Sequence, residues 1–262
     1  MAFGILSTTM YSQSSSTDLE LIRIKSDSIL KESRLLYRLE KAAWISTDIA
    51  FQKSELMETV GGMVSYFEED QVISLYCDQN NEYVLAEYIF KNVNESPIKE
   101  SYLKRKLSSK EQNILAAKNK FIDQISTTDY ELMIYEGFSP NITQLESESG
   151  YKFYITTGAQ ENDVIPFGND VLFWTDVTGK ILTHQKFHKS FIPGYTKYND
   201  SIITNMSHSH VKDYPYISAT DISTFRLYAP FSVVKSFNVL SGALGVEFQY
   251  HLDTDEITLR KL

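Results

Sequence analysis

The sequence predicts an α+β protein, with an α/β arrangement as the alternative. Two observations lead to this class. An apolar stripe with helical spacing runs from Asp18 to about Lys53, and short runs of alternating apolar and polar residues follow it. The second half of the chain is richer in strand patterns and contains one short helix. We therefore expect residues 17–127 to form a helix, a three-strand antiparallel meander and a second helix, followed by a strand-rich region over 128–262.

Composition limits the classes of partner. The chain has 262 residues, of which 42% are hydrophobic and 23% charged, as is usual for a globular protein with a sizeable core. The net charge of −9 argues against a nucleic-acid partner, because phosphate binding needs a basic face. Cys77 is the only cysteine, which excludes an intramolecular disulfide and a thiolate zinc cluster. No run of eighteen or more apolar residues is present to span a membrane.

The N-terminal residues 1–16 have two interpretations. Met1–Met10 is a short apolar run, and a serine cluster follows it. This resembles the back half of a signal peptide that lacks its basic segment, which would indicate a periplasmic or secreted protein. The alternative is a disordered tail on a cytoplasmic protein.

The first half of the chain carries clear start and stop signals. The first helix should begin at a cap on Ser16 or Thr17 and end before Gly61-Gly62, with a break around 26–28 or 46–48 as an alternative. Ser108 and Glu111 form a capping box for a second helix to about Ile125. The basic residues before that helix are interpreted as solvated rather than as a binding patch. The expected strands of the meander are Met63–Glu68, Gln71–Cys77 and Glu82–Lys91.

The second half is predicted mainly as strands. Asp221–Tyr228 is the one short helix, stopped by Pro230. A tight turn over 176–179, with Gly179 at a positive φ, should connect two strands of a hairpin. The expected strands are Tyr130–Tyr135, Tyr151–Thr157, Val171–Thr175, Lys180–His188, Ser201–Met206, Lys235–Leu240, Val246–Leu252 and Glu256–Leu259.

One stretch of this half carries chemistry. His208 and His210 are two residues apart at the end of a predicted strand, so their side chains point to the same side. Ser218 and Asp221 follow at the start of the short helix, where the helix dipole keeps a carboxylate ionised. Two imidazoles and a carboxylate are the protein ligands of many catalytic zinc sites, which keep a fourth position for water. The pattern therefore predicts a Zn²⁺ site and hydrolysis of an amide or similar acyl bond.

A simpler interpretation accounts for part of this pattern. Ser218 and Asp221 also have the spacing of a capping box for the helix that follows them. His208 and His210 would then be exposed polar residues at a strand end. Capping gives no reason for the paired histidines, so we favour the metal site.

The stretch from His208 to Asp221 resembles the signature of the JAMM (MPN-like) zinc metalloproteases. The resemblance covers roughly residues 130–262 and is specific only over 208–221. It implies a mixed β-sheet flanked by helices, with His208, His210 and Asp221 as zinc ligands. It also implies that Ser218 assists the oxyanion of the tetrahedral intermediate, and that the substrate is a peptide or an isopeptide.

Two positions depart from the family pattern. The family usually has a proline after the second histidine, where this chain has Val211. Its members also carry a catalytic glutamate, the general base, on an upstream strand. Glu148 is the nearest candidate here, with Glu136 and Glu161 as alternatives. Without such a base, the site would bind metal with little catalysis.

The other histidines and motifs add less. His184 and His188 share a face of one predicted strand, and either would extend the metal shell, although a surface strand is the commoner explanation. The turn Pro166–Asp170 is interpreted as a plain turn rather than as part of a cleft. No phosphate-binding glycine loop, G-x-S-x-G elbow or H-E-x-x-H helix is present.

The sequence thus supports two hypotheses. The first is a zinc-dependent hydrolase of peptide or isopeptide bonds, which acts on a peptide or protein substrate. The second is a non-catalytic binding or interaction protein that keeps the metal site or only its scaffold. Neither hypothesis involves nucleic acid, and the sequence leaves the oligomeric state open.

Overall fold

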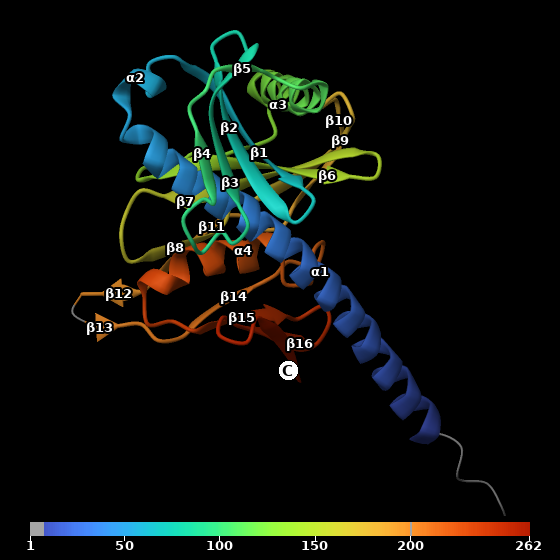
Figure 1. Ribbon diagram of the computed structural model, residues 1–262. Coiled ribbons are helices and arrows are strands. Elements are labelled where there is room, and N and C mark those ends of the chain that lie inside the picture. The colour runs from blue at the N-terminus through green and yellow to red at the C-terminus, as the bar shows by residue number, and fades with distance from the viewer. Residues whose placement is uncertain (1–7, 200) are drawn as a thin grey trace, which may run out of the picture.

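The computed structural model describes residues 8–199 and 201–262, and it has the predicted α+β class (Figure 1). Most of the apolar run Met1–Met10, namely residues 1–7, lies outside the described residues. None of the described helices is long and apolar enough to cross a membrane. The helices are α1 Thr8–Phe51, α2 Ser54–Met57, α3 Ser109–Thr127 and α4 Ala219–Tyr228, with a 3₁₀ turn at Ala229–Phe231.

The long helix α1 differs from the prediction at its start. It begins at Thr8 and passes through the expected cap and both expected breaks without interruption for 44 residues. Inside the helix, the hydroxyls of Ser26, Ser33 and Ser46 donate to backbone carbonyls three or four residues earlier. These bonds satisfy the buried serine side chains within the helix, so a serine there does not need to end it.

Helix α1 packs across both halves of the chain. In Figure 1 it runs diagonally from the meander sheet at the top to the C-terminal strands at the bottom, and its N-terminal part extends beyond them. Leu36 and Leu39 of α1 belong to the largest core cluster, which also contains Tyr88 of the meander and Phe225 and Phe248 of the C-terminal region. The two predicted regions therefore share one hydrophobic core.

The antiparallel meander is confirmed. Its strands are β1 Val60–Glu68, β2 Gln71–Asp78 and β3 Tyr83–Phe90, and short strands β4 Lys99–Ser101 and β5 Arg105–Lys106 both pair with β3. Gly61-Gly62 lies within β1 instead of ending the helical region. A Cβ on Gly61 would lie 2.3 Å from the Cα of Gln79, so the close approach of the two chains requires glycine there.

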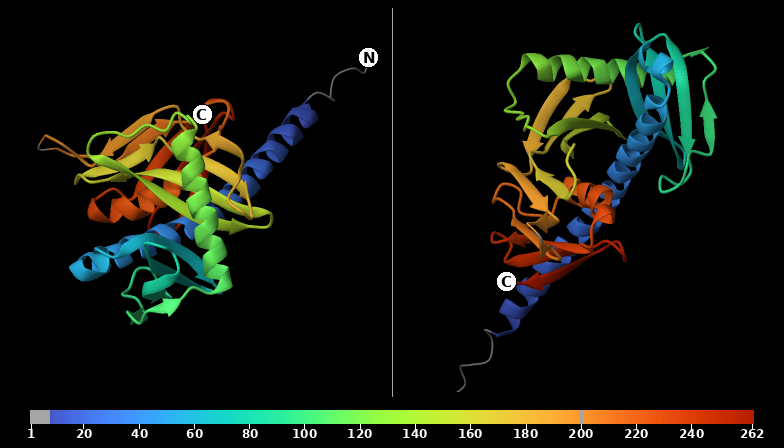
Figure 2. Two further views of the ribbon diagram at one scale, coloured as in Figure 1. Left: turned by 90° about the horizontal axis from the view of Figure 1, so that it is seen from above. Right: turned by 90° about the vertical axis from the view of Figure 1, so that its left-hand side faces the viewer.

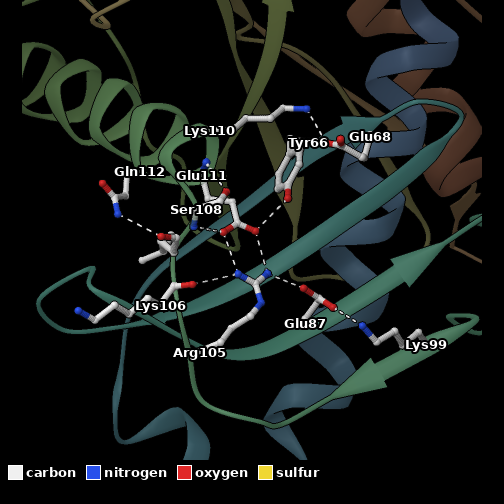
Figure 3. Close-up of polar contacts among 11 residues, drawn as sticks. Tyr66, Glu68, Glu87, Lys99, Arg105, Lys106, Ser108, Lys110, Glu111 and Gln112 are labelled. Atoms are coloured by element: carbon white, nitrogen blue, oxygen red, sulfur yellow. Dashed lines mark hydrogen bonds and ion pairs between the residues drawn. The ribbon is translucent and has the colours of Figure 1, made fainter.

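The second helix, α3, begins at the predicted capping box. The Ser108 N–H donates to the Glu111 carboxylate at 2.7 Å, and the Glu111 N–H donates to the Ser108 hydroxyl at 3.3 Å. Both terminal nitrogens of Arg105 donate to the same carboxylate at 2.8 Å, and Arg105 also contacts Glu87 of β3 at 2.5 Å (Figure 3). One arginine therefore ties the start of α3 to the meander sheet.

Strands of the second half form three further sheets and a two-stranded ribbon. A four-stranded antiparallel sheet has the order β10-β9-β7-β6, and β11 pairs with β8. The C-terminal sheet has the order β14-β15-β16-β17. The strand bounds are β6 Phe138–Ser147, β7 Gly150–Ala159, β8 Val164–Gly168, β9 Val171–Asp176, β10 Ile181–Lys186, β11 Phe191–Tyr195, β12 Lys197–Tyr198, β13 Ser201–Ile202, β14 Met206–Ser209, β15 Ser236–Ser241, β16 Val246–His251 and β17 Glu256–Lys261.

Several strand predictions need correction. Tyr130–Tyr135 forms no strand, whereas β6, which we did not predict, pairs along the whole of β7. The predicted strand Ser201–Met206 is divided: β13 covers its first two residues, His208 lies within the separate strand β14, and His210 directly follows that strand. The β9–β10 hairpin is confirmed, with Gly179 at φ +85° in its turn.

The C-terminal sheet is mixed because β14 and β15 are parallel, whereas β15, β16 and β17 pair antiparallel. Helix α4 connects β14 to β15, so these three elements form a β-α-β unit. In such a unit the helix begins near the C-terminal end of the strand that precedes it. This topology places the end of β14 beside the first turn of α4.

Replacing Arg105 by methionine should destabilise the protein by about 2–4 kcal/mol, because the buried Glu111 carboxylate loses its charged partner. Urea denaturation measures the change. Lys99→Met is the matched control: the Lys99 side chain is 55% exposed in its pair with Glu87, so its loss should cost less than about 1 kcal/mol. Equal effects of the two variants would contradict the structural role of Arg105.

Lowering the pH should reduce the free energy of unfolding through protonation of Glu111. Burial tends to raise the Glu111 pKa, but the bonds from Arg105 and Ser108 outweigh it and lower the pKa to about 2. Because the folded pKa lies below the unfolded value of about 4.3, this contribution is present above that pH and is lost as the pH falls towards 2. The slope of unfolding free energy against pH over this window should therefore be smaller in Glu111→Gln than in the wild type. Unchanged slopes would refute the assignment.

Candidate metal centre

The β-α-β unit brings His208, His210 and Asp221 together, as the sequence pattern predicts. Burial alternates along β14, so that Ser207 and Ser209 are exposed while His208 and His210 are buried on one side. The ring of His208 packs against two aromatic rings, with its centroid 5.2 Å from that of Phe167 and 6.0 Å from that of Phe237. The hydrophobic environment fixes the orientation of this imidazole.

Ser218 caps helix α4. Its backbone N–H donates to Asp221 Oδ2 at 3.0 Å, and the Asp221 N–H donates to Ser218 Oγ at 2.9 Å. Both residues are almost fully buried. Asp221 thus serves in the capping box and also faces the histidines, which are buried and not exposed as the simpler interpretation expected. The Ser218 hydroxyl also contacts the Thr220 hydroxyl at 2.8 Å.

A third histidine, His188, completes the group. It lies between β10 and β11, outside the strand on which we placed it, and is only 5% exposed. The surface-strand interpretation is correct for His184, which is exposed on β10, and wrong for His188. Its Nε2 is 3.4 Å from His208 Nε2 and 3.3 Å from Asp221 Oδ1.

The four donor atoms have the spacing that a small ion requires. His208 Nε2 and His210 Nε2 are 3.2 Å apart, and Asp221 lies 3.3 Å from the first and 3.0 Å from the second. Four ligands placed tetrahedrally at the usual zinc–nitrogen and zinc–oxygen distances are about 3.3 Å from one another. The chain therefore contains a buried group, His188, His208, His210 and Asp221, that could hold a metal ion.

The electrostatics of the group fit a bound cation. Burial would raise the pKa of Asp221, but the three imidazoles hold it well below its usual range. Burial would lower the pKa of His188, but Asp170 and Asp221 raise it well above its usual range. Asp221 Oδ1 is buried and receives no hydrogen bond from the described residues, although two imidazole nitrogens face it. A dication among these atoms would neutralise the carboxylate and contact the unsatisfied oxygen.

Asp170 and Thr220 support the position of His188 through polar contacts. Its Nδ1 lies 2.6 Å from Asp170 Oδ1, which fixes the proton on Nδ1 and leaves Nε2 as a ligand. Thr220 of α4 donates to the other oxygen of Asp170. A carboxylate behind a ligating histidine is typical of zinc sites. Our interpretation of Pro166–Asp170 as a plain turn is therefore wrong, because Pro166–Gly168 lies in β8 and Asp170 is buried against the candidate ligand.

The candidate general bases lie elsewhere. Glu148 is exposed in the turn between β6 and β7, whereas Thr156 and Thr157 of β7 line a crevice beside Asp221. The eight residues from Glu148 to Thr156 correspond to about 26 Å of strand. Glu136 and Glu161 are also exposed, and neither belongs to the ligand group. The crevice itself has no room for a water molecule.

Comparisons with known proteins provide no independent assignment. No protein-family model, no curated protein and no solved structure matches this chain. The argument for its function therefore depends on the geometry of its own residues.

Replacing Asp170 by asparagine should weaken zinc binding about 10- to 100-fold, because His188 loses the carboxylate that orients its ring. Competition with a fluorescent chelator measures the affinity. Asp163→Asn is the control, since Asp163 is exposed at the start of β8, and it should leave the affinity unchanged. A wild-type affinity in Asp170→Asn would show that Asp170 does not support the centre.

Proposed function

We propose that this chain is a zinc-binding protein whose ion has a structural role, with His188, His208, His210 and Asp221 as its four ligands. The observation that carries the proposal is the position of His188 Nε2, 3.3–3.4 Å from two other ligand atoms. Catalytic zinc sites keep one position for water, whereas structural sites fill all four with protein ligands. Three imidazoles and a carboxylate fill all four here.

The donor set and its surroundings favour zinc. Imidazole nitrogen and carboxylate oxygen in tetrahedral spacing suit Zn²⁺, whereas Mg²⁺ and Ca²⁺ prefer six or more oxygen ligands. The ligand side chains are at most 5% exposed, so a bound ion would be shielded from solvent. Such a site suits an ion that stays bound rather than one that meets a substrate.

The ligands come from separate parts of the chain, which packing and the hydrogen bond from Thr220 to Asp170 also hold together. His188 follows a strand of the β10-β9-β7-β6 sheet, His208 lies on β14 of the C-terminal sheet with His210 directly after it, and Asp221 lies in the first turn of α4. An ion bound by all three segments connects the two sheets. Binding that occurs only in the folded chain stabilises it by about 2.7 kcal/mol when zinc is at one hundred times its dissociation constant.

A zinc-dependent hydrolase of peptide or isopeptide bonds is the second candidate. It is favoured by the resemblance of the segment 208–221 to the JAMM signature and by the β-α-β placement of that segment. A bound zinc ion would supply Lewis-acid activation of a carbonyl group. For this function His188 would have to give up its position among the ligands, and a general base would have to come from outside the described group.

Metal analysis combined with a peptidase assay tests the proposal. Purified wild-type protein should contain stoichiometric zinc, and His210→Ala should lose it, while His184→Ala, which changes an exposed histidine, should keep it. A chelator should lower the melting temperature of the wild type by several degrees and leave His210→Ala unchanged. A quenched fluorescent peptide library and an ε-linked isopeptide should not be cleaved by the wild type.

Two results would overturn parts of this account. Wild-type protein without zinc after refolding in zinc would exclude the metal centre. Zinc-dependent cleavage by the wild type, abolished in His210→Ala, would establish the hydrolase in place of the structural role. Cleavage that appears only in His188→Ala would support a closed site, because removing the fourth ligand would open it to substrate.

A further inference from the structure

A cavity of about 550 Å³ lies away from the candidate metal centre, and none of the four ligands lines it. Its walls come from α1, β1, α3, the β6–β7 pair and α4. Figure 2 shows α1 and α3 on different sides of the β6–β7 strands. This volume falls in the range of pockets that hold small organic molecules. A second cavity of about 470 Å³ adjoins it and shares Trp44, Ala159 and Tyr228.

A buried carboxylate lines the cavity. Glu40 of α1 is only 8% exposed, and one of its oxygens, Oε1, accepts hydrogen bonds from Thr143 and Thr156 at 3.0 Å. No cation lies within ion-pair distance of Glu40 among the described residues, and Oε2 receives no hydrogen bond from them. Burial raises the Glu40 pKa. A buried carboxylate held at one oxygen is oriented but not neutralised, which is costly unless a partner arrives.

A half-buried ammonium group lines the same cavity. Lys118 of α3 donates to the backbone carbonyl of Met63 at 2.8 Å, which leaves two of its three donors without a partner among the described residues. Burial lowers its pKa to about 8. Glu40 and Lys118 do not pair with each other, since no ion pair between them lies within 4.0 Å in the described parts of the chain.

The remaining wall is partly aromatic. Trp44 and Tyr228 lie side by side with ring centroids 5.6 Å apart, and both line the cavity. The Tyr228 hydroxyl accepts a hydrogen bond from the Ala159 N–H, which holds the ring in place. Fixed aromatic faces of this kind bind flat apolar groups.

We propose that this cavity binds an aromatic amino acid or a short peptide in its dipolar form, with the ligand ammonium at Glu40, the carboxylate at Lys118 and the aromatic side chain against Trp44. Two opposite charges that are kept apart in one cavity are complementary to a ligand that carries both charges. A ligand with only one of them would leave the other protein charge in the cavity without a charged partner. This proposal does not depend on the metal centre.

Binding can be followed through Trp44 itself. The chain has two tryptophans, so Trp174→Phe leaves Trp44 as the only source of tryptophan fluorescence. The dipolar probes are L-phenylalanine and glycyl-L-phenylalanine, and the single-charge probes are 2-phenylethylamine and 3-phenylpropionate. Calorimetry on the full chain provides the affinities. At least one dipolar probe should bind about tenfold more tightly than either single-charge probe, since it makes one more charged hydrogen bond.

Substitutions assign the two ends of the ligand. Glu40→Gln should weaken the dipolar probe and the amine about tenfold and leave the carboxylate probe unchanged. Lys118→Met should weaken the dipolar probe and the carboxylate and leave the amine unchanged. Glu20→Gln and Lys120→Met, which change exposed residues of the same two helices, are the controls. Circular dichroism confirms that each variant is folded.

The proposal fails if no probe binds saturably at millimolar concentration, or if all probes bind equally well. It also fails if neither variant alters the affinity of the dipolar probe. Repeating the titration with His210→Ala separates this site from the metal centre: dipolar binding without zinc supports an independent cavity whether or not the centre binds zinc.

Discussion

The C-terminal region depends on a cluster of three imidazoles and one carboxylate that is shielded from solvent. Their facing atoms lie 3.0–3.4 Å apart, and the side chains are at most 5% exposed. Burying an ionised carboxylate is costly unless positive charge compensates it. Either protons on the imidazoles or a bound dication would provide that positive charge. Only the dication can accept lone pairs from all four side chains at once. Binding of a cation to this cluster would therefore be coupled to the folding of this region.

The local part of this centre was predictable from sequence, and the long-range part was not. His208, His210 and Asp221 belong to one β-α-β unit, so strand alternation and the helix start determine their approach. His188 and Asp170 enter from connections in another sheet, and no periodicity in the chain reveals that these connections meet β14. In the sequence, His188 and Asp170 are each a polar residue beside an apolar one. Ordinary turns show the same pattern, so it does not identify a metal ligand.

The fold shows the same division. The capping box at Ser108 and the alternating pattern of the meander predicted their elements correctly, because both signals are local. Helix α1 begins ten residues before the predicted start at Asp18, and it continues through the possible break at 26–28, where the Ser26 hydroxyl donates to the preceding turn. Strand β6 was missed because Pro140 and Asn141 weaken its pattern, whereas its pairing with β7 is a tertiary interaction.

One strand connects the metal centre to the cavity. Thr156 of β7 donates to Glu40 at the cavity, and the same residue and Thr157 line the crevice beside Asp170 and Asp221. The position of β7 is therefore fixed from both sides, by the helix α1 and by the loops that carry the ligands. A centre with four protein ligands would suit this role, since a bound ion could hold those loops without exchanging a ligand for substrate. A catalytic centre would require the opposite property, a ligand position that opens to substrate.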